Sequence, residues 1–152
     1  MRRKEKEITD AAEIEDILSR AEICHLAMAE DNLPYVVAVN YGYADYCLYI
    51  HSAPTGKKID IIRKNNRVCF AVDVDVEVIE TDSVHKCSTK YESVIGYGAA
   101  TIVTDDAGKK AGLDVLMAQY SDTTHEYPQE LLDKMVIIKI EIEGMTGKQS
   151  LD

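Results

Sequence analysis

Three long runs rich in β-branched residues constrain the fold of this chain most. They cover residues 68–78, 91–103 and 136–143. In the last run, valine and isoleucine alternate with lysine and glutamate, which is the period-two pattern of a half-buried strand. Gly96 and Gly98 interrupt the middle run and predict a bulge or a close backbone approach there. With 152 residues, 46% of them hydrophobic, the chain can form one core, so we expect a single domain spanning 1–152.

Shorter strands are predicted in the first third of the chain, at 23–29, 35–43 and 47–51. Polar turns at 30–32 and 44–45 separate them. Strands joined by short polar turns are typical of antiparallel hairpins. We therefore expect these three strands to form a meander, with each strand pairing with the next.

Helical segments lie between the strands. After a cap at Thr9 or Asp10, apolar residues recur at 14, 17, 18 and 21, and a similar spacing follows Asp106. Shorter helices are predicted at 57–65 and after Pro128. Because helices and strands do not alternate regularly, the pattern argues against a parallel sheet. It predicts a mainly β fold: a closed or partly closed antiparallel barrel of six to seven strands with flanking helices.

Charge and hydropathy narrow the class of function. The formal net charge is −10, which argues against a nucleic-acid partner because binding to a phosphate backbone needs a broad basic surface. No apolar run approaches the roughly 20 residues that span a bilayer. The charged start of the chain, residues 1–7, has no apolar segment behind it. We expect a cytoplasmic protein that has no membrane partner.

The four cysteines do not indicate a metal site. Cys24, Cys47 and Cys69 lie inside apolar strand-like runs, where a free cysteine behaves as a small buried hydrophobic residue. His85 and Cys87 lie in a polar segment and could form half of a site, but no second pair of suitable spacing accompanies them. We therefore expect no zinc.

A basic segment follows the strand that ends at His51 and Ser52. The chain turns through residues 53–56 and meets Lys57 and Lys58. Between 57 and 67 there are five positive charges and one carboxylate, a balance of +4 in a chain whose remainder sums to about −14. Ammonium, hydroxyl and imidazole groups at the start of a helix are suited to a phosphate. A simpler interpretation is the solvated face of a short helix, with Ser52 only capping the turn.

The order of several motifs resembles the pyridoxamine-phosphate-oxidase-like flavoproteins, most of all the branch that includes the nitroimidazole-resistance (Nim) proteins. The resemblance covers most of the chain. Its landmarks are the segments 1–4 (MRRK), 8–10 (ITD), 33–37 (LPYVV), 39–43 (VNYGY), 48–53 (LYIHSA), 56–58 (GKK), Asn65, 68–70 (VCF) and 91–98 (YESVIGYG).

The resemblance implies an FMN-binding split barrel and a homodimer with flavin at each of two interface sites. It places the phosphate-gripping pair on Lys57 and Lys58, and further phosphate or ribityl contacts on His51 and Ser52. It places a partner-subunit residue near the flavin ring on Ser93. The strand along the ring edge falls on Val36, Val37, Ala38, Val39, Asn40 and Tyr41.

Two departures argue against oxidation of pyridoxamine phosphate itself. Ser93 stands where the vitamin-processing oxidases carry glutamine, and their C-terminal substrate-binding tryptophan and arginine are missing, since the chain has no tryptophan at all. We expect an FMN-dependent oxidoreductase, with FAD as an alternative cofactor. It would pass electrons from a reduced nicotinamide or another donor to a small acceptor such as a nitroaromatic.

The sequence is also compatible with roles that involve no turnover. The protein could be a flavin- or haem-binding carrier or sensor, or a dimeric barrel without cofactor. His51 could be a polar strand end, and Asn40, Tyr41 and Tyr43 could be ordinary strand residues. No catalytic acid or base is assigned, although Tyr41, Tyr43 and His51 could each donate a proton.

Overall fold

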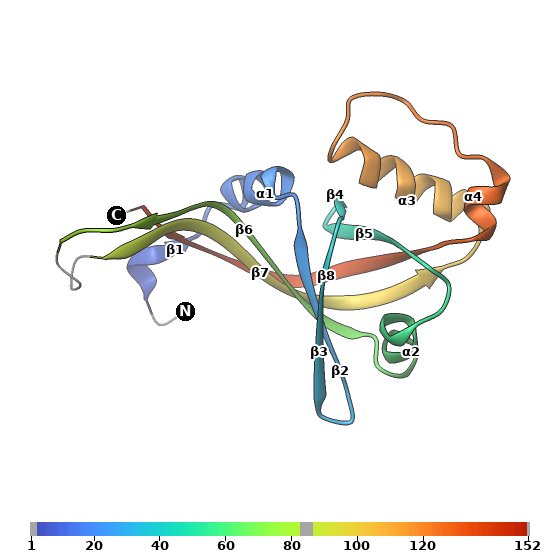
Figure 1. Cartoon of the computed structure of the whole chain (residues 1–152), viewed down its shortest axis with the longest axis horizontal. Coiled ribbons are helices and arrows are strands. Elements are labelled where there is room, and N and C mark those ends of the chain that lie inside the picture. Colours follow the sequence, from blue (N-terminus) through green and yellow to red (C-terminus); the bar gives the residue numbers. More distant parts are fainter. Residues whose placement is uncertain (1–2, 83–86, 152) are drawn as a thin grey trace.

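The computed structural model describes residues 3–82 and 87–151, and it confirms a mainly β antiparallel fold with flanking helices (Figure 1). The described residues form eight strands, one or two more than expected. These are β1 (Glu7–Ile8), β2 (Cys24–Glu30), β3 (Leu33–Val39), β4 (Gly42–Ala44), β5 (Cys47–Ser52), β6 (Arg67–Ile79), β7 (Ser88–Val103) and β8 (Val136–Ser150).

The strands form one antiparallel sheet in the order β3-β2-β6-β7-β8-β5-β4, with β1 paired to β8. Within the described residues no ladder joins β3 to β4, so the sheet is not closed by hydrogen bonds. The long strands β6, β7 and β8 form its middle. All three predicted long runs are strands, and each strand extends beyond the predicted run.

Both predicted hairpins form, but the expected three-stranded meander is wrong because its middle strand is divided. The predicted strand 35–43 is divided into β3, which pairs with β2, and β4, which pairs with β5 at the other end of the strand order. Between them, the fully buried Tyr41 side chain donates its hydroxyl hydrogen bond to the carbonyl of Leu18. The backbone N–H of Tyr41 donates to the Tyr120 hydroxyl at 3.1 Å instead of to a strand. Contacts with two helical segments therefore take the chain out of the sheet here.

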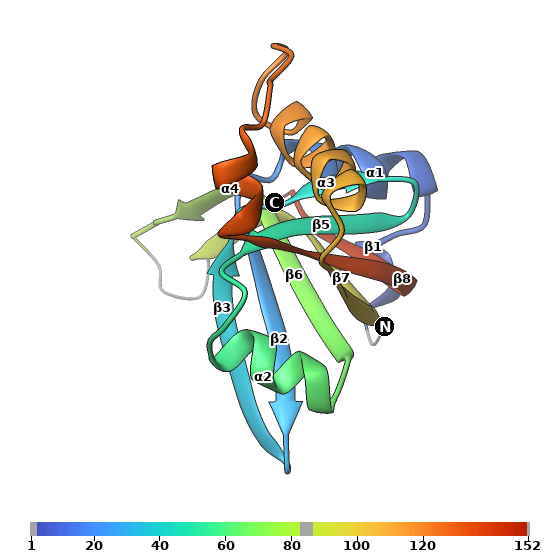
Figure 2. The same ribbon diagram turned by 90° about the vertical axis from the view of Figure 1, so that its right-hand side faces the viewer.

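Four α-helices and one short 3-10 helix, η1, cover parts of the sheet (Figure 2). Asp10 caps α1 by accepting from the Ala12 N–H at 2.9 Å, and Asp105 caps α3 by accepting from the Gly108 N–H at 2.8 Å. Their bounds are η1 (Lys4–Lys6), α1 (Ala11–Arg20), α2 (Lys57–Lys64), α3 (Asp106–Ala118) and α4 (Gln129–Asp133).

The core lies on the inner face of the sheet, under α1 and α2. Leu26, Phe70 and Ile140, from three different strands, are fully buried there. Cys24 and Cys47 are buried and free, as expected, whereas Cys69 is only half-buried. Inward-facing and outward-facing residues alternate along the strands, so the opposite face of the sheet is left for contacts outside this core.

Gly96 and Gly98 on β7 lie where the sequence predicted a close approach. A Cβ added at Gly96 would lie 2.2 Å from the Phe70 ring, and one at Gly98 would lie 2.3 Å from the Glu141 carbonyl oxygen. The pairing of β7 with β8 also shifts between Tyr97 and Gly98. Both the bulge and the close approach are therefore present.

We expect Gly98→Ala to lower the free energy of unfolding by about 1–3 kcal/mol, because the new methyl group must displace the β8 backbone. Gly144→Ala is the matched control, since a Cβ at Gly144 on β8 meets nothing within 4 Å. Urea denaturation of both variants measures the difference. Equal midpoints for the two variants would contradict the close approach.

Candidate functional site

The predicted phosphate segment lies where β5 runs into α2. β5 ends at Ser52, and Gly56 precedes α2 with φ +120°, a backbone angle that favours glycine. No side chain caps the first turn of α2, so its outward N–H groups remain available to an anion. An open cleft of about 370 Å³ lies over this junction, lined by Tyr35, Val37, His51, Ser52, Ala53, Thr55, Gly56, Lys57 and Lys58.

The cleft joins two strands that stand far apart in the sheet order. Tyr35 and Val37 come from β3 at one end, and His51 and Ser52 come from β5 near the other. The sheet therefore curls until these two strands and α2 surround one hollow. This is the opening of the split barrel, and it places the predicted phosphate ligands at that opening.

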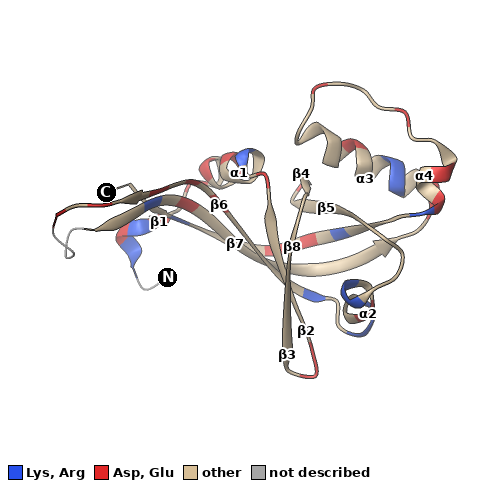
Figure 3. Cartoon of the chain, viewed as in Figure 1, with Lys and Arg blue, Asp and Glu red and all other residues tan. Residues whose placement is uncertain are grey.

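Ion pairs neutralise some of the cations in the basic segment. Lys64 pairs with Glu30, and Arg67 pairs with Glu143. Within residues 3–82 and 87–151, no carboxylate lies within ion-pair distance of Lys57 or Lys58. Figure 3 shows the lysine and arginine residues of α2 in blue. The Lys57 ammonium lies 4.5 Å from the centre of the Tyr35 ring, a cation–π contact.

Lys58 is the residue of the cleft whose pKa is shifted by its surroundings. Its side chain is half-buried, and burial lowers its pKa from the ordinary value of 10.5. An opposite charge nearby would counteract that shift, but the described part of the chain supplies none. Ser52, beside it, is 7% exposed, whereas His51 is open to solvent. The free protein thus holds a partly desolvated cation next to hydrogen-bond donors.

The structure brings together five of the predicted site residues and separates the rest. Lining the cleft are Val37, His51, Ser52, Lys57 and Lys58. Side chains alternate along β3, so Val36 and Ala38 lie on its other face, while Val39 packs on the core. Asn40 instead donates to the Glu22 carbonyl at 3.3 Å.

Two predicted residues lie outside the cleft for other reasons. Tyr41 has its ring in the core and its hydroxyl bound to Leu18, so its side chain cannot contact a cofactor in the cleft. Ser93 lies on β7, opposite Asp73 and Lys148, and its hydroxyl donates to the Lys148 carbonyl at 3.4 Å. Ser93 is therefore not part of this protomer's cleft.

Of the other lining residues, Ala53, Thr55 and Gly56 belong to the turn of the predicted phosphate segment, although none was assigned as a ligand. Tyr35 was missed. It could have been found, because it shares the parity of Val37 along the strand and therefore its face.

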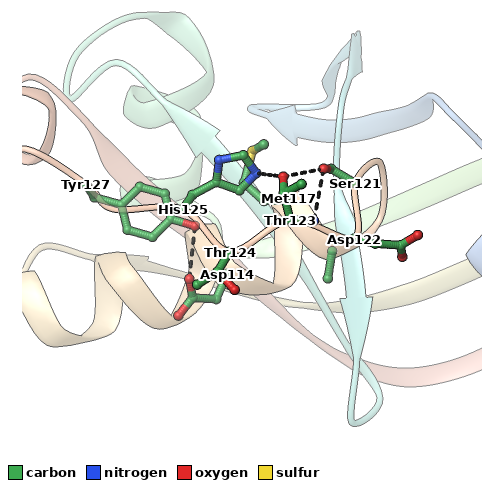
Figure 4. Close-up of a pocket in the computed structure, with 9 residues that line it drawn as sticks. Asp114, Met117, Ser121, Asp122, Thr123, Thr124, His125 and Tyr127 are labelled. Atoms are coloured by element: carbon green, nitrogen blue, oxygen red, sulfur yellow. Dashed lines mark hydrogen bonds between the residues drawn. The ribbon is translucent and has the colours of Figure 1, made fainter.

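A second cleft, of about 340 Å³, lies between α3 and the 119–128 loop (Figure 4). Its polar groups are arranged differently from those at α2. The Tyr127 hydroxyl donates to Asp114 at 2.9 Å, and half-buried His125 lies 3.1 Å from the Thr123 hydroxyl. The residues that line it include two aspartates and no lysine or arginine. It is therefore poorly suited to a phosphate.

On the sheet face opposite the core, α3 and α4 pack over Tyr49, Val103 and Ile137. We call the remainder of this face, which α3 and α4 leave open, the outer face. Strand register places Val36, Ala27, Cys69 and Tyr97 in one row across β3, β2, β6 and β7. Ile95 lies in the next row. Val36, Ile95 and Tyr97 are 60%, 45% and 58% exposed. A contiguous exposed surface of this kind is typical of a protein–protein contact.

Two further expectations concern metals and membranes. In the part of the chain that the structure describes, no three histidine, cysteine, aspartate or glutamate side chains gather in a way that could hold a metal. His85, half of the pair considered from sequence, lies outside the described residues. No described helix combines the length and apolarity needed to cross a bilayer.

We expect Lys58→Met to raise the free energy of unfolding of the ligand-free protein, by no more than about 1 kcal/mol because solvent screens the exposed part of the side chain. The gain should shrink as pH rises toward 10.5. In that range the unfolded state holds more protons than the folded state, so the parent itself becomes more stable with pH. Chemical denaturation at several pH values tests this, with Lys57→Met as control. A less stable Lys58→Met would show that the ammonium has a partner in the free protein.

Comparison with known proteins identifies the family. The family profile described as pyridoxamine 5'-phosphate oxidase matches residues 10–149. A solved structure from Bacteroides thetaiotaomicron, described as a candidate 5-nitroimidazole antibiotic resistance protein, is 30% identical. The alignment covers 94% of this chain and 86% of that one, with a TM-score of 0.84.

Two further relatives have a lower sequence identity or align over a shorter part of the chain. A FAD-binding protein from Mesorhizobium loti is 28% identical over 93% of this chain and 95% of that chain, with a TM-score of 0.67. An uncharacterised protein of Rhizobium meliloti is 32% identical over 60 residues, and the match spans 40% of this chain and only 39% of the relative's length. Because the family profile spans nearly the whole chain, the chain belongs to the pyridoxamine 5'-phosphate oxidase family.

Proposed function

We propose that this chain is a cytoplasmic, FMN-dependent oxidoreductase that acts as a homodimer and binds the flavin phosphate in the cleft at α2. It would pass electrons from a reduced nicotinamide or another donor to a small acceptor such as a nitroaromatic. The observation that carries the proposal is the half-buried Lys58, which has no ion-pair partner in residues 3–82 and 87–151, beside Lys57 at a helix start with no described side-chain cap.

The residues of the cleft fit a phosphate monoester. Such a group carries about 1.5 to 2 negative charges at neutral pH and accepts several hydrogen bonds. Lys57 and Lys58 can balance that charge, and Ser52, Thr55 and the first N–H groups of α2 can donate. A Cβ at Gly56 would meet nothing within 4 Å, so the backbone is also open to close approach there.

The flavin ring would extend from the cleft along β3. This strand is at the end of the sheet order, so one of its edges has no strand partner among the described residues. Its free N–H and C=O groups can hydrogen-bond a planar heterocycle. Val36 and Ala38 turn toward the outer face, which a second copy would cover. Ser93 would then reach the ring from the partner copy.

The comparisons support a flavin cofactor in general terms. The Mesorhizobium loti relative is described as binding FAD, and the Bacteroides thetaiotaomicron relative is described in terms of nitroimidazole resistance. FMN is preferred over FAD here because the α2 cleft is suited to a terminal phosphate, which FMN has. Identification of the flavin released from purified protein decides between them.

Bound flavin supplies the electron chemistry, while the protein binds it, orients it and controls access of water and protons. Among the three candidate proton donors, Tyr41 is buried and Tyr43 donates to Glu15 at 3.1 Å. Burial together with Glu15 raises the pKa of Tyr43 to about 12. His51 is the one of the three whose side chain is exposed in the cleft. Because the phosphate would occupy this cleft and the ring would lie along β3, the imidazole of His51 is placed to contact the phosphate or the ribityl chain, and none of the three is assigned as a proton donor.

We expect Lys57→Ala/Lys58→Ala to keep the fold and to weaken FMN binding at least about tenfold, because each charge-assisted hydrogen bond contributes about 1.5–3 kcal/mol. Fluorescence titration of apoprotein with FMN measures this. The double variant Lys110→Ala/Lys134→Ala removes the same charge from α3 and the end of α4 and serves as control. Riboflavin, which lacks the phosphate, should bind the parent and the test variant alike. Equal FMN affinity in all three proteins would refute the site.

We expect the holoprotein to oxidise NADH or NADPH repeatedly when a nitroaromatic acceptor is present. The nicotinamide is oxidised while the nitro group is reduced, so the steady-state loss of nicotinamide absorbance should far exceed one equivalent per flavin. A carrier or sensor would stop after stoichiometric reduction. That outcome, with both nicotinamides and several acceptors, would leave flavin binding intact but would remove the proposed turnover.

A further inference from the structure

The β6–β7 hairpin projects beyond the rest of the molecule (Figure 1). We call its described outer part, residues 76–79 of β6 and 88–91 of β7, the arm. Val76 and Val78 on the arm are 61% and 67% exposed, among the most exposed large hydrophobic residues described. Two neighbouring exposed apolar side chains on a protruding hairpin are suited to contact with a partner surface.

A β-bulge at the base of the arm determines which way these valines point. Asp75 has φ +52°, and the register with β7 shifts there: Val74 pairs with Glu92, but Glu77 pairs with Lys90. The extra residue reverses the alternation of β6 relative to β7. Before the bulge, valines of β6 face the core. After it, Val76 and Val78 face the other way.

The bulge adds the two valines to the outer face. Val78 pairs directly with Thr89, and directly paired residues share a face. Along β7, Thr89 shares its face with Tyr91, Ile95 and Tyr97, because side chains of equal parity point the same way. Exposed apolar side chains therefore occur on one face from Val36 on β3, across the sheet, to the arm, with the polar row of Asp73, Ser93 and Lys148 between Ile95 and the arm.

Arg20 at the end of α1 fixes the arm at its base. Its guanidinium contacts Asp75 at 2.6 Å, Glu92 at 2.7 Å and Asp16 at 2.7 Å. These contacts tie the bulge, the neighbouring strand and the helix together. The orientation of the arm is thus set before any partner binds, which lowers the entropic cost of docking.

Charge favours a second copy of this chain as the partner. The chain has a net charge of −10, so most of its surfaces would repel a copy of themselves. The outer face is different, because strand register places three bases and four acids on it. They are Arg67, Lys139 and Lys148, and Glu7, Asp73, Glu141 and Glu143. A surface with nearly balanced charge and exposed apolar side chains can pack against its own copy.

From these observations we infer that the arm packs against the second protomer of the dimer, with Val76 and Val78 buried against that protomer's outer face. The inference rests on the proposed homodimer and adds a specific anchor to it. It predicts that the two valines contribute to association and not to folding of the protomer.

The experiment measures dimerisation of apoprotein, without flavin, by sedimentation velocity over a range of concentrations. We expect Val76→Asp/Val78→Asp to raise the dimer dissociation constant at least about tenfold, because each dimer would lose four buried valines. Leu131→Asp/Tyr46→Asp introduces the same charge at two residues that are 45% and 46% exposed elsewhere, and it should not change the constant. Val76→Thr/Val78→Thr, nearly isosteric and favourable in strands, should weaken dimerisation in the same direction if the aspartate variant does not fold.

The outcomes separate this inference from the proposed function. If the parent is a dimer and all variants dimerise equally tightly, the proposed role of the arm is refuted, while the proposed dimer and flavin site are unaffected. If the parent is a monomer at all concentrations, both the dimer and the arm are refuted, whereas FMN titration still tests the phosphate cleft separately. Weaker dimerisation in the valine variants alone supports the arm.

Discussion

The antiparallel ladder of β6, β7 and β8 is the interaction on which the rest of the structure depends. These three strands are each 13 to 16 residues long, and their inner faces bury valine and isoleucine together with Phe70 and Ala100. β2 and β3 attach to one side of this ladder through β6, and β5 and β4 attach to the other through β8. Because the sheet twists and curls, strands that hang from opposite sides meet at the α2 cleft.

The distribution of charge makes that cleft suited to an anion. Lys64 and Arg67 are neutralised by Glu30 and Glu143, so the basic segment is less cationic in space than along the chain. Among the described residues, Lys57, Lys58 and Arg63 of this segment have no ion-pair partner. Only the two lysines line the cleft, where the helix start adds its own partial positive charge. Holding Lys58 half-buried without a carboxylate disfavours its charged form in the free protein. A bound anion would favour the charged form of Lys58. Part of the free energy of its interaction with the ammonium would therefore offset the desolvation of Lys58 in the free protein.

The sequence predicted those features that depend on residues close together along the chain. Strand periodicity located the long strands, and helix spacing with an Asp10 cap located α1. The turn before Lys57 located the cleft because chain neighbours supply most of its polar groups. The division of 35–43 could not be read this way, since Tyr41 is drawn out of the sheet by Leu18 and Tyr120, which are distant in sequence. For the same reason, no local pattern showed that Lys64 and Arg67 have acidic partners, or that the Asp75 bulge turns two valines outward.

The cleft and the outer face share one element, β3, whose two faces serve different purposes. Tyr35 and Val37 line the cleft, whereas Val36 and Ala38 lie on the apolar surface. A cofactor that lies along the edge of β3 would therefore touch both regions, and a partner on the outer face would touch the cofactor. Binding and association would then be thermodynamically coupled: whatever factor the flavin adds to dimer affinity, dimerisation must add to flavin affinity. If flavin binds as proposed, the second copy would then enclose a cleft that is open in one protomer.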